Sequence, residues 1–210
     1  MTHFRDRRDG GKKLANSVED LEFDYVAAIP RGGVAVGVEV AKNRNKPLLV
    51  VGVRKIPIPW SPEAGFGAVA EDGSTFINEK IFDHLGLSVE ETEELAEEVR
   101  KEVERRIKTY REEPLPDMSG KTVLLVDDGF ASGYTAIAAI ELLKNKGATV
   151  YAAAPCSPSD TVKLLEGYAD KVVVIKEQKW GSFAVASYYH EFSDLSDEEV
   201  VKMLSELSPG

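Results

Sequence analysis

Two adjacent carboxylates followed by a short loop are the residues of this sequence best suited to chemistry. Asp127 and Asp128 follow the apolar run 123–126 and precede the loop 129–135, which contains two glycines, a serine and a threonine. Ionised carboxylates accept strong hydrogen bonds from hydroxyl groups, but they repel anions. The acid pair therefore predicts a site for the neutral hydroxyl groups of a ligand.

The loop after the two acids is predicted to bind an anion. It connects an apolar run typical of a buried parallel strand to the apolar helix pattern 136–143. Unpaired backbone N–H groups and the positive end of the helix dipole meet at such a helix start. Gly129 and Gly133 would let the backbone adopt unusual dihedrals and approach a phosphate, and Ser132 and Thr135 add hydroxyl donors. A ribose 5-phosphate fits both halves; the alternative is a strand that happens to end in two aspartates.

A second loop of the same kind occurs near the amino terminus. Residues 23–29 are predicted to form a buried strand and residues 34–42 a helix, and Arg31, Gly32 and Gly33 lie in the loop between them. The arginine adds a positive side chain to a helix N-terminus. Two such loops in one chain indicate a phosphorylated ligand much more specifically than either alone, because Arg-Gly-Gly is a common sequence.

The segment 123–135 resembles the phosphoribosyl pyrophosphate (PRPP) motif of type I phosphoribosyltransferases, with Ser132 at the usual threonine position. The resemblance implies that Asp127 and Asp128 hold the ribose hydroxyl groups. It assigns the 5-phosphate to Ala131, Ser132, Gly133, Tyr134 and Thr135, and the pyrophosphate to Arg31, Gly32 and Gly33. Mg²⁺ would arrive bound to PRPP, so no residue is assigned as a metal ligand. The whole chain resembles a subgroup of predicted, poorly characterised phosphoribosyltransferases.

The segment 54–70 is expected to be a long irregular loop, because it contains three prolines and two glycines. A turn at residues 71–74 is flanked by two short predicted strands, so residues 54–78 should form a mobile loop and a hairpin. In the family that the chain resembles, a mobile loop closes over the reacting centre and brings basic residues to the pyrophosphate. Arg54 and Lys55 are the candidates here, and the alternative is a surface loop without a function.

The remaining elements predict an α/β fold. Further strands are expected at 47–53, 148–154 and 170–175, a capped helix at 88–111 with Val89 on its buried stripe, and a closing helix at 196–207. Alternating apolar strands and helices predict a parallel sheet flanked by helices on both faces. Residues 1–210 are expected to form a single phosphoribosyltransferase domain, in which residues 176–193 supply the small hood that the resemblance implies.

The hood segment is rich in aromatic residues that are candidates for binding an acceptor base. Phe183, with Trp180 or Tyr188 nearby, is expected to stack on the base, although Phe183 as a simple core residue is an equal alternative. Transferases for 6-oxopurines carry a second aspartate in the phosphate loop, where this sequence has Ala131. The resemblance therefore predicts an acceptor other than hypoxanthine or guanine. Cys156 is expected to be a small buried residue, with a contact to substrate as the alternative, and His190 is expected to be a packed or surface residue and not a general base.

Composition restricts the function classes. The chain of 210 residues has a net charge of −10, which argues against nucleic acid or an anionic membrane as partner. Without a long apolar run or a signal-peptide pattern, a cytoplasmic location is expected. The charged leader 4–15 is expected to be a solvated helix packed by Phe4 and Leu14, and the charged face of helix 88–111 is likewise expected to be solvated.

The implied reaction is the displacement of pyrophosphate from PRPP by a nitrogen nucleophile. PRPP and a heterocyclic acceptor would be the small-molecule partners, and a homodimer is usual in the family. Two alternatives remain. The first is a non-catalytic sensor of PRPP or nucleotides with the same fold. The second is a nucleotide-binding domain of another family, which lacks support because the sequence contains neither Gly-x-Gly-x-x-Gly nor a Walker A motif.

Overall fold

A five-stranded parallel sheet forms the centre of the computed structural model, which describes residues 3–207. In spatial order its strands are β2 (Leu48–Val50), β1 (Tyr25–Ala28), β6 (Thr122–Val126), β7 (Thr149–Pro158) and β8 (Lys171–Gln178). Each neighbouring pair is parallel. The predicted α/β fold is therefore confirmed, although β7 and β8 extend further at their carboxyl ends than the sequence pattern indicated.

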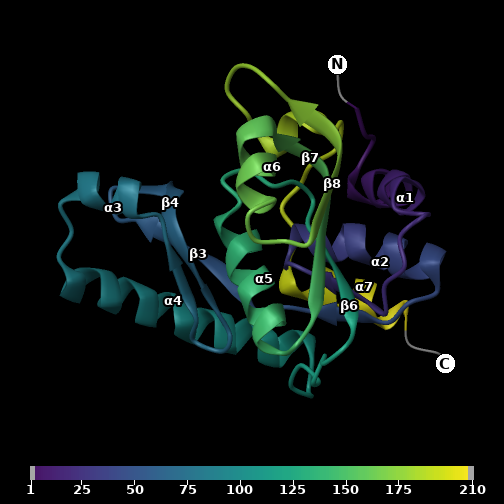
Figure 1. Cartoon of the computed structure of the whole chain (residues 1–210), viewed down its shortest axis with the longest axis horizontal. Coiled ribbons are helices and arrows are strands. Elements are labelled where there is room, and N and C mark those ends of the chain that lie inside the picture. Colours follow the sequence, from purple (N-terminus) through teal and green to yellow (C-terminus); the bar gives the residue numbers. More distant parts are fainter. Residues whose placement is uncertain (1–2, 208–210) are drawn as a thin grey trace.

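Helices cover both faces of this sheet, as predicted (Figure 1). Along β6, Val123 and Leu125 pack into one core cluster, whereas Leu124 and Val126 pack into the other. The first cluster is covered by α5 (Tyr134–Asn145) and α6 (Ser159–Leu165), and the second by α1 (Arg7–Ser17), α2 (Gly32–Arg44) and α7 (Asp197–Ser205). The strands are apolar at consecutive positions because both of their faces are buried.

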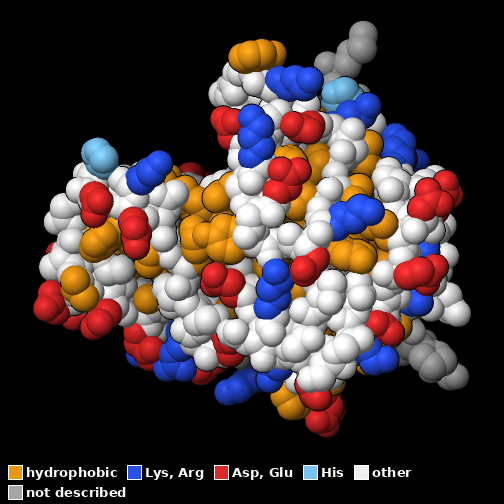
Figure 2. All heavy atoms as spheres, viewed as in Figure 1, with side chains coloured by type: hydrophobic (Ala, Val, Ile, Leu, Met, Phe, Trp, Pro, Cys, Tyr) orange, Lys and Arg blue, Asp and Glu red, His pale blue; other side chains and the backbone are white. Residues whose placement is uncertain are grey.

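A second, antiparallel sheet stands beside the first and belongs to a separate lobe, at the left of Figure 1. It contains β3 (Val53–Ile58), β4 (Ser61–Ala70) and β5 (Thr75–Ile77), and it packs on α4 (Val89–Tyr110), with α3 (Glu79–Leu85) at the outer end. Ile56, Phe66, Val99 and Val103 form the centre of its core. In the face that Figure 2 shows, acidic side chains gather around the outer end of this lobe.

The prediction of an irregular loop at residues 54–70 is wrong. This segment is a hairpin of β3 and β4, with register shifts on either side of Pro57. A proline has no N–H group to donate to the neighbouring strand, and it is therefore tolerated in a sheet where the pairing of the strands is irregular. The predicted strand 47–53 is also divided: the chain leaves the parallel sheet after Val50 and enters the hairpin at Val53.

The capping motifs in the sequence correctly predicted where α4 and α7 begin. Ser88 and Ser196 both form the predicted capping boxes, in which the serine hydroxyl accepts from the backbone of Glu91 and Glu199, respectively. Val89, which was expected in the buried stripe of α4, is instead 61% exposed, because the first turn of the helix lies beyond the core of the lobe. None of the helices formed by residues 3–207 combines the length and the apolar character needed to cross a membrane.

The hood segment, residues 176–193, folds over the carboxyl ends of β7 and β8 and contains the short 3-10 helix η1 (Val185–Tyr188). Its aromatic residues do not pack alone. Phe4 forms a parallel bridge with Tyr189, and both side chains are buried in one cluster with Cys156 and Tyr188. The start of the chain is therefore part of the hood, which no local pattern in the sequence indicated.

Candidate active site

The site lies where the chain order of the sheet reverses. From β1 the chain proceeds to β2 on one side, whereas from β6 it proceeds to β7 and β8 on the other. The helices that follow β1 and β6, which are α2 and α5, cover opposite faces of the sheet. Loops at the carboxyl ends of two such strands separate and leave a crevice, and ligands of open α/β sheets bind there. Both predicted anion-binding loops end at this crevice.

The two loops are in direct contact through glycines. A Cβ atom on Gly32 would lie 1.9 Å from Oδ2 of Asp128, and one on Gly33 would lie 2.8 Å from the carbonyl oxygen of Val126. Distances this short exclude a side chain at either position, because one neighbour is a backbone atom and the other is a carboxylate oxygen already held by a hydrogen bond. The glycines thus allow the start of α2 to approach the acid pair, and the structure brings together the two motifs that the sequence analysis singled out.

The loop 131–135 has the conformation expected of an anion-binding turn. Gly133 has φ of 81°, in the left-handed region, and forms the N-cap of α5. Ala131 and Ser132 are exposed, and Thr161 fixes the loop by donating a 2.6 Å hydrogen bond to the carbonyl of Ala131. Tyr134 turns inward, where its hydroxyl group accepts a 2.9 Å hydrogen bond from Asn78. Only the backbone of Tyr134 therefore remains available to a phosphate.

The explanation that the sequence suggested for Gly129 requires correction. Its backbone does not have positive φ. A Cβ at this position would instead lie 2.8 Å from both methyl carbons of Val185 and 2.9 Å from Sγ of Cys156. Gly129 is therefore required by the close packing of the hood on the acid loop.

Arg7 is a site residue that the sequence analysis missed. Its Nε donates a 2.7 Å hydrogen bond to Oδ2 of Asp128, and the two side chains are only 11% and 14% exposed. The guanidinium group also lies 3.7 Å from the ring centroid of Phe192 and donates to the carbonyl of Ser193 at 2.7 Å. The expectation of a merely solvated leader was therefore wrong for this residue. The partners are 121 positions apart, so spacing could not reveal the pair.

The two acids differ in how readily they ionise. Burial raises the pKa of Asp127 well above its usual range, and the neighbouring charge of Asp128 raises it further. Burial also raises the pKa of Asp128, but the charge and the hydrogen bond of Arg7 oppose that shift. Asp128 is therefore the acid that loses its proton first, and Asp127 retains its proton to a higher pH.

A cleft of about 610 Å³ opens in front of the acid pair. Its lining comes from both anion loops, the β3–β4 hairpin and helix α4: Ile29, Pro30, Arg31, Gly32, Val53, Arg54, Lys55, Pro62, Glu63, Arg106, Asp127, Asp128 and Thr135. The predicted residues Arg54 and Lys55 lie on its hairpin wall. Lys55 donates to the carbonyl of Glu63 across the hairpin, and Arg54 pairs with Glu102 of α4 at 3.4 Å.

The predicted base-binding residues lie outside this lining. Trp180 is 87% exposed on the loop after β8. Tyr188 is buried, its ring is stacked on His3 at 5.4 Å, and its hydroxyl donates to Gln178 at 2.7 Å. Phe183 is partly buried against Tyr188. Cys156 is buried as expected, and burial raises the pKa of its thiol, so that it remains protonated.

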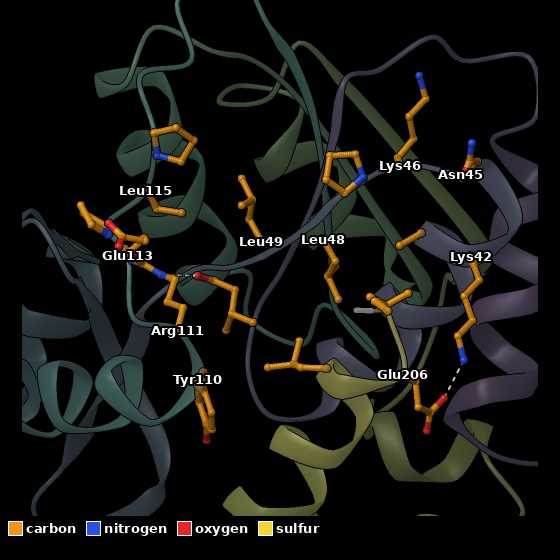
Figure 3. A pocket seen from close by; sticks show the side chains of 17 residues that line it. Lys42, Asn45, Lys46, Leu48, Leu49, Tyr110, Arg111, Glu113, Leu115 and Glu206 are labelled. Atoms are coloured by element: carbon orange, nitrogen blue, oxygen red, sulfur yellow. Dashed lines mark hydrogen bonds and ion pairs between the residues drawn. The ribbon is translucent and has the colours of Figure 1, made fainter. Parts of the chain in front are cut away.

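A larger hollow, of about 1050 Å³, lies along the edge strand β2 (Figure 3). Leu48 and Leu49 of the edge strand, Leu115 and the end of α7 form its walls, with Lys42 paired to Glu206 at its rim. It contains neither a helix N-terminus nor the acid pair. The chemistry of the chain is therefore assigned to the smaller cleft.

Comparison with known proteins identifies the family. The model of the phosphoribosyl transferase domain matches residues 7–191. Two Mycobacterium tuberculosis proteins from different strains, "Putative phosphoribosyl transferase Rv0571c" and "Putative phosphoribosyl transferase MT0597", are each 37% identical over 209 residues, which is 97% of this chain and 47% of the relative. The chain thus spans about half the length of these curated relatives.

A solved structure agrees with this match. The crystal structure of TT1426 from Thermus thermophilus is 34% identical to this chain, covers 100% of both chains and has a TM-score of 0.80. Since the family model covers most of the sequence and both anion loops fall within it, the resemblance noted in the sequence is confirmed: the chain belongs to the phosphoribosyl transferase domain family.

Proposed function

We propose that the chain transfers the ribose 5-phosphate group of PRPP to a nitrogen acceptor and releases pyrophosphate. The observation that supports this most directly is the contact between Gly32 and Asp128, which places two helix N-termini and an acid pair around one cleft. A phosphate at each helix N-terminus and a diol at the acids correspond to the two ends and the centre of PRPP.

In this reaction, the bond between ribose C1 and the pyrophosphate oxygen breaks and a bond from C1 to the acceptor nitrogen forms. The pyrophosphate takes the bonding electron pair, the nitrogen supplies the new one, and its proton passes to solvent. Asp127 and Asp128 hold the ribose hydroxyl groups, and the amides of residues 131–135 hold the 5-phosphate. Arg31 and the start of α2 hold the leaving group. Positioning and charge stabilisation supply the rate acceleration.

The donor set of the cleft fits a magnesium ion that enters with PRPP. Within residues 3–207, no group of three His, Cys, Asp or Glu side chains is placed to hold a metal alone. Mg²⁺ commonly binds through one or two carboxylates together with substrate phosphates and water. Asp127 and Asp128 are the carboxylates that would meet it, and the ion would neutralise charge on the leaving pyrophosphate.

The acceptor is proposed to be a planar heterocycle other than hypoxanthine or guanine, because Ala131 occupies the position where transferases for 6-oxopurines carry an aspartate. An alanine cannot exchange a proton with a purine ring. Of the three aromatic residues predicted to bind the base, Phe183 is the best candidate for a stacking surface, since Tyr188 is buried and Trp180 lies on an outer loop. Stacking on a single aromatic ring is tolerant of base identity.

A pyrophosphate-release assay tests the function. With PRPP, Mg²⁺ and each common nucleobase in turn, release above the rate without acceptor is expected for at least one base, but not for hypoxanthine or guanine. Tight PRPP binding without release for any acceptor would favour the sensor alternative. Absence of PRPP binding would refute the proposal as a whole, and efficient turnover of hypoxanthine or guanine would refute the choice of acceptor.

The outer half of the β3–β4 hairpin is expected to close over bound PRPP. Beyond the register shifts at Pro57 the ladder is irregular, and residues 61–64 are exposed, whereas Ile56 and Phe66 are anchored in the core of the lobe. Hydrogen exchange should therefore show new protection at residues 57–65 when PRPP and Mg²⁺ are added. The anchored parts of the hairpin should change little. Protection confined to residues 127–135 would contradict a closing hairpin.

A further inference from the structure

Helix α4 contributes an arginine to the cleft, although its charged face was expected to be only solvated. Arg106 lines the cleft together with Arg31 and Arg54. This part of α4 belongs to the outer lobe, far in sequence from both anion loops. Its presence beside the start of α2 raises the question of what the additional positive charge binds.

The arginine cluster consists of Arg31, Arg54, Arg105 and Arg106. The carboxylate of Glu102 is shared by the last three. Glu102 accepts hydrogen bonds from Arg105 at 2.8 and 3.0 Å, and it lies 2.8 Å from Nε of Arg106 and 3.4 Å from Nη1 of Arg54. Hydrogen bonds from Arg105, with the charges of Arg106 and Arg54, lower the pKa of Glu102 to about 2. The carboxylate is therefore ionised at every physiological pH, and it holds the guanidinium groups in place.

Within residues 3–207, the carboxylates that pair with the cluster are nevertheless too few to neutralise it. Asp197, at the start of α7, lies 3.9 Å from Arg31 and 3.5 Å from Arg105, so Glu102 and Asp197 serve four arginines. Burial lowers the pKa of Arg54, and the charge of Arg106 lowers it further. Positive charge that is concentrated and only partly paired at the wall of a cleft favours an anionic ligand.

Like Arg31, whose carboxylate partner is 3.9 Å away, Arg106 is incompletely bonded. Its side chain is 24% exposed, and its Nε is buried without a well-directed hydrogen bond within the described part of the chain, although Glu102 is close. Arg105, in contrast, makes two hydrogen bonds to the same carboxylate and is absent from the cleft lining. Arg106 can therefore turn its guanidinium to an incoming phosphate while Arg105 stays on Glu102.

We propose that Arg106 is a pyrophosphate-binding residue supplied by α4, and that Glu102 positions it beside Arg54 before the ligand arrives. This inference rests on the proposed function. Its chemistry is the bidentate contact between a guanidinium group and phosphate oxygens, for which arginine is better suited than lysine. The outer lobe then contributes to the binding of the leaving group as well as to the wall of the cleft.

Calorimetric titration with three ligands in Mg²⁺ buffer tests the inference. Arg106→Gln should bind inorganic pyrophosphate and PRPP at least tenfold more weakly than the parent chain, and should bind ribose 5-phosphate within about twofold of it. Arg106→Lys should give a smaller loss, and it replaces Arg106→Gln if that variant does not fold. Two controls on the same helix are Arg100→Gln, which removes surface pairs with Glu97 and Glu104, and Arg105→Gln, which removes another partner of Glu102.

The outcomes separate this inference from the proposed function. If the parent chain binds neither PRPP nor ribose 5-phosphate, the proposed function fails and the inference fails with it. If the parent binds PRPP and Arg106→Gln binds pyrophosphate equally well, only the inference is overturned. An equal loss in Arg105→Gln would also overturn it, because the effect would then come from an unpaired Glu102. A loss specific to Arg106, and restricted to ligands with a pyrophosphate group, supports it.

Discussion

Arg7→Gln should destabilise the protein by about 3–5 kcal/mol, because the variant keeps the buried carboxylate of Asp128 and removes its cationic partner. The pair has an Nε to Oδ2 distance of 2.7 Å, and both side chains are mostly buried. Glutamine can still donate one hydrogen bond, but it cannot offset the charge. The free energy of unfolding from urea denaturation at neutral pH measures this loss.

The same variant should show a characteristic pH dependence. Without Arg7, the pKa of Asp128 rises further above its ordinary value, since burial is then opposed by less positive charge. In the window between the ordinary and the raised pKa, the folded state binds more protons than the unfolded state, so stability falls as the pH rises. The difference between the parent and the variant should therefore be small at acidic pH and grow toward neutrality. The acid limb of PRPP binding should move to higher pH.

A matched control is available in the same segment of the chain. Arg5 pairs with Asp6 at 2.9 Å, but its side chain is 68% exposed, and pairs of that kind contribute little. Arg5→Gln should leave both stability and its pH dependence nearly unchanged. Similar losses in the two variants, or a loss in Arg7→Gln that does not vary with pH, would contradict the role assigned to the Arg7–Asp128 pair.

The parts of the site that the sequence revealed are those encoded within one short segment. Each anion loop consists of a strand, a turn and a helix start in consecutive residues. The hydrophobic pattern, the positions of the glycines and the start of the helix can therefore all be recognised within one short stretch of sequence. The capping boxes at Ser88 and Ser196 are local for the same reason. The fold class followed because the apolar runs are too continuous for a sheet with one face in water.

The parts that the sequence did not reveal depend on tertiary contacts between distant segments. Arg7 meets Asp128 only because α1 packs beside the hood, and Arg106 meets the cleft only because the lobe folds against the start of α2. Composition led to a wrong prediction at residues 54–70, where prolines and glycines suggested a loop. The core around Ile56 and Phe66 stabilises a hairpin despite them, so tertiary packing outweighed local propensity there.

Asp127→Asn/Asp128→Asn should lose most of its affinity for PRPP. Each carboxylate that accepts a charge-assisted hydrogen bond from a ribose hydroxyl contributes on the order of 1.5–3 kcal/mol, which corresponds to about 10- to 150-fold in affinity. The two residues are adjacent, and each affects the pKa of the other, so the effects of the two substitutions on affinity are not expected to be additive. Calorimetric titration of PRPP into the variant measures the loss.

Ligands that contain only part of PRPP make this prediction specific to the diol. The affinity for ribose 5-phosphate should fall together with that for PRPP. Inorganic pyrophosphate in the absence of Mg²⁺ should bind as well as before or better, because the negative charge of the acid pair, which repels it, is gone. Asp128→Asn also leaves Arg7 without its carboxylate, so Asp127→Asn alone, which breaks no ion pair, separates ligand contact from stability. Asp83→Asn, an exposed position on α3, is the surface control. Undiminished PRPP affinity in a folded double variant would remove the acid pair from the site and leave the two anion loops to bind phosphates without a ribose between them.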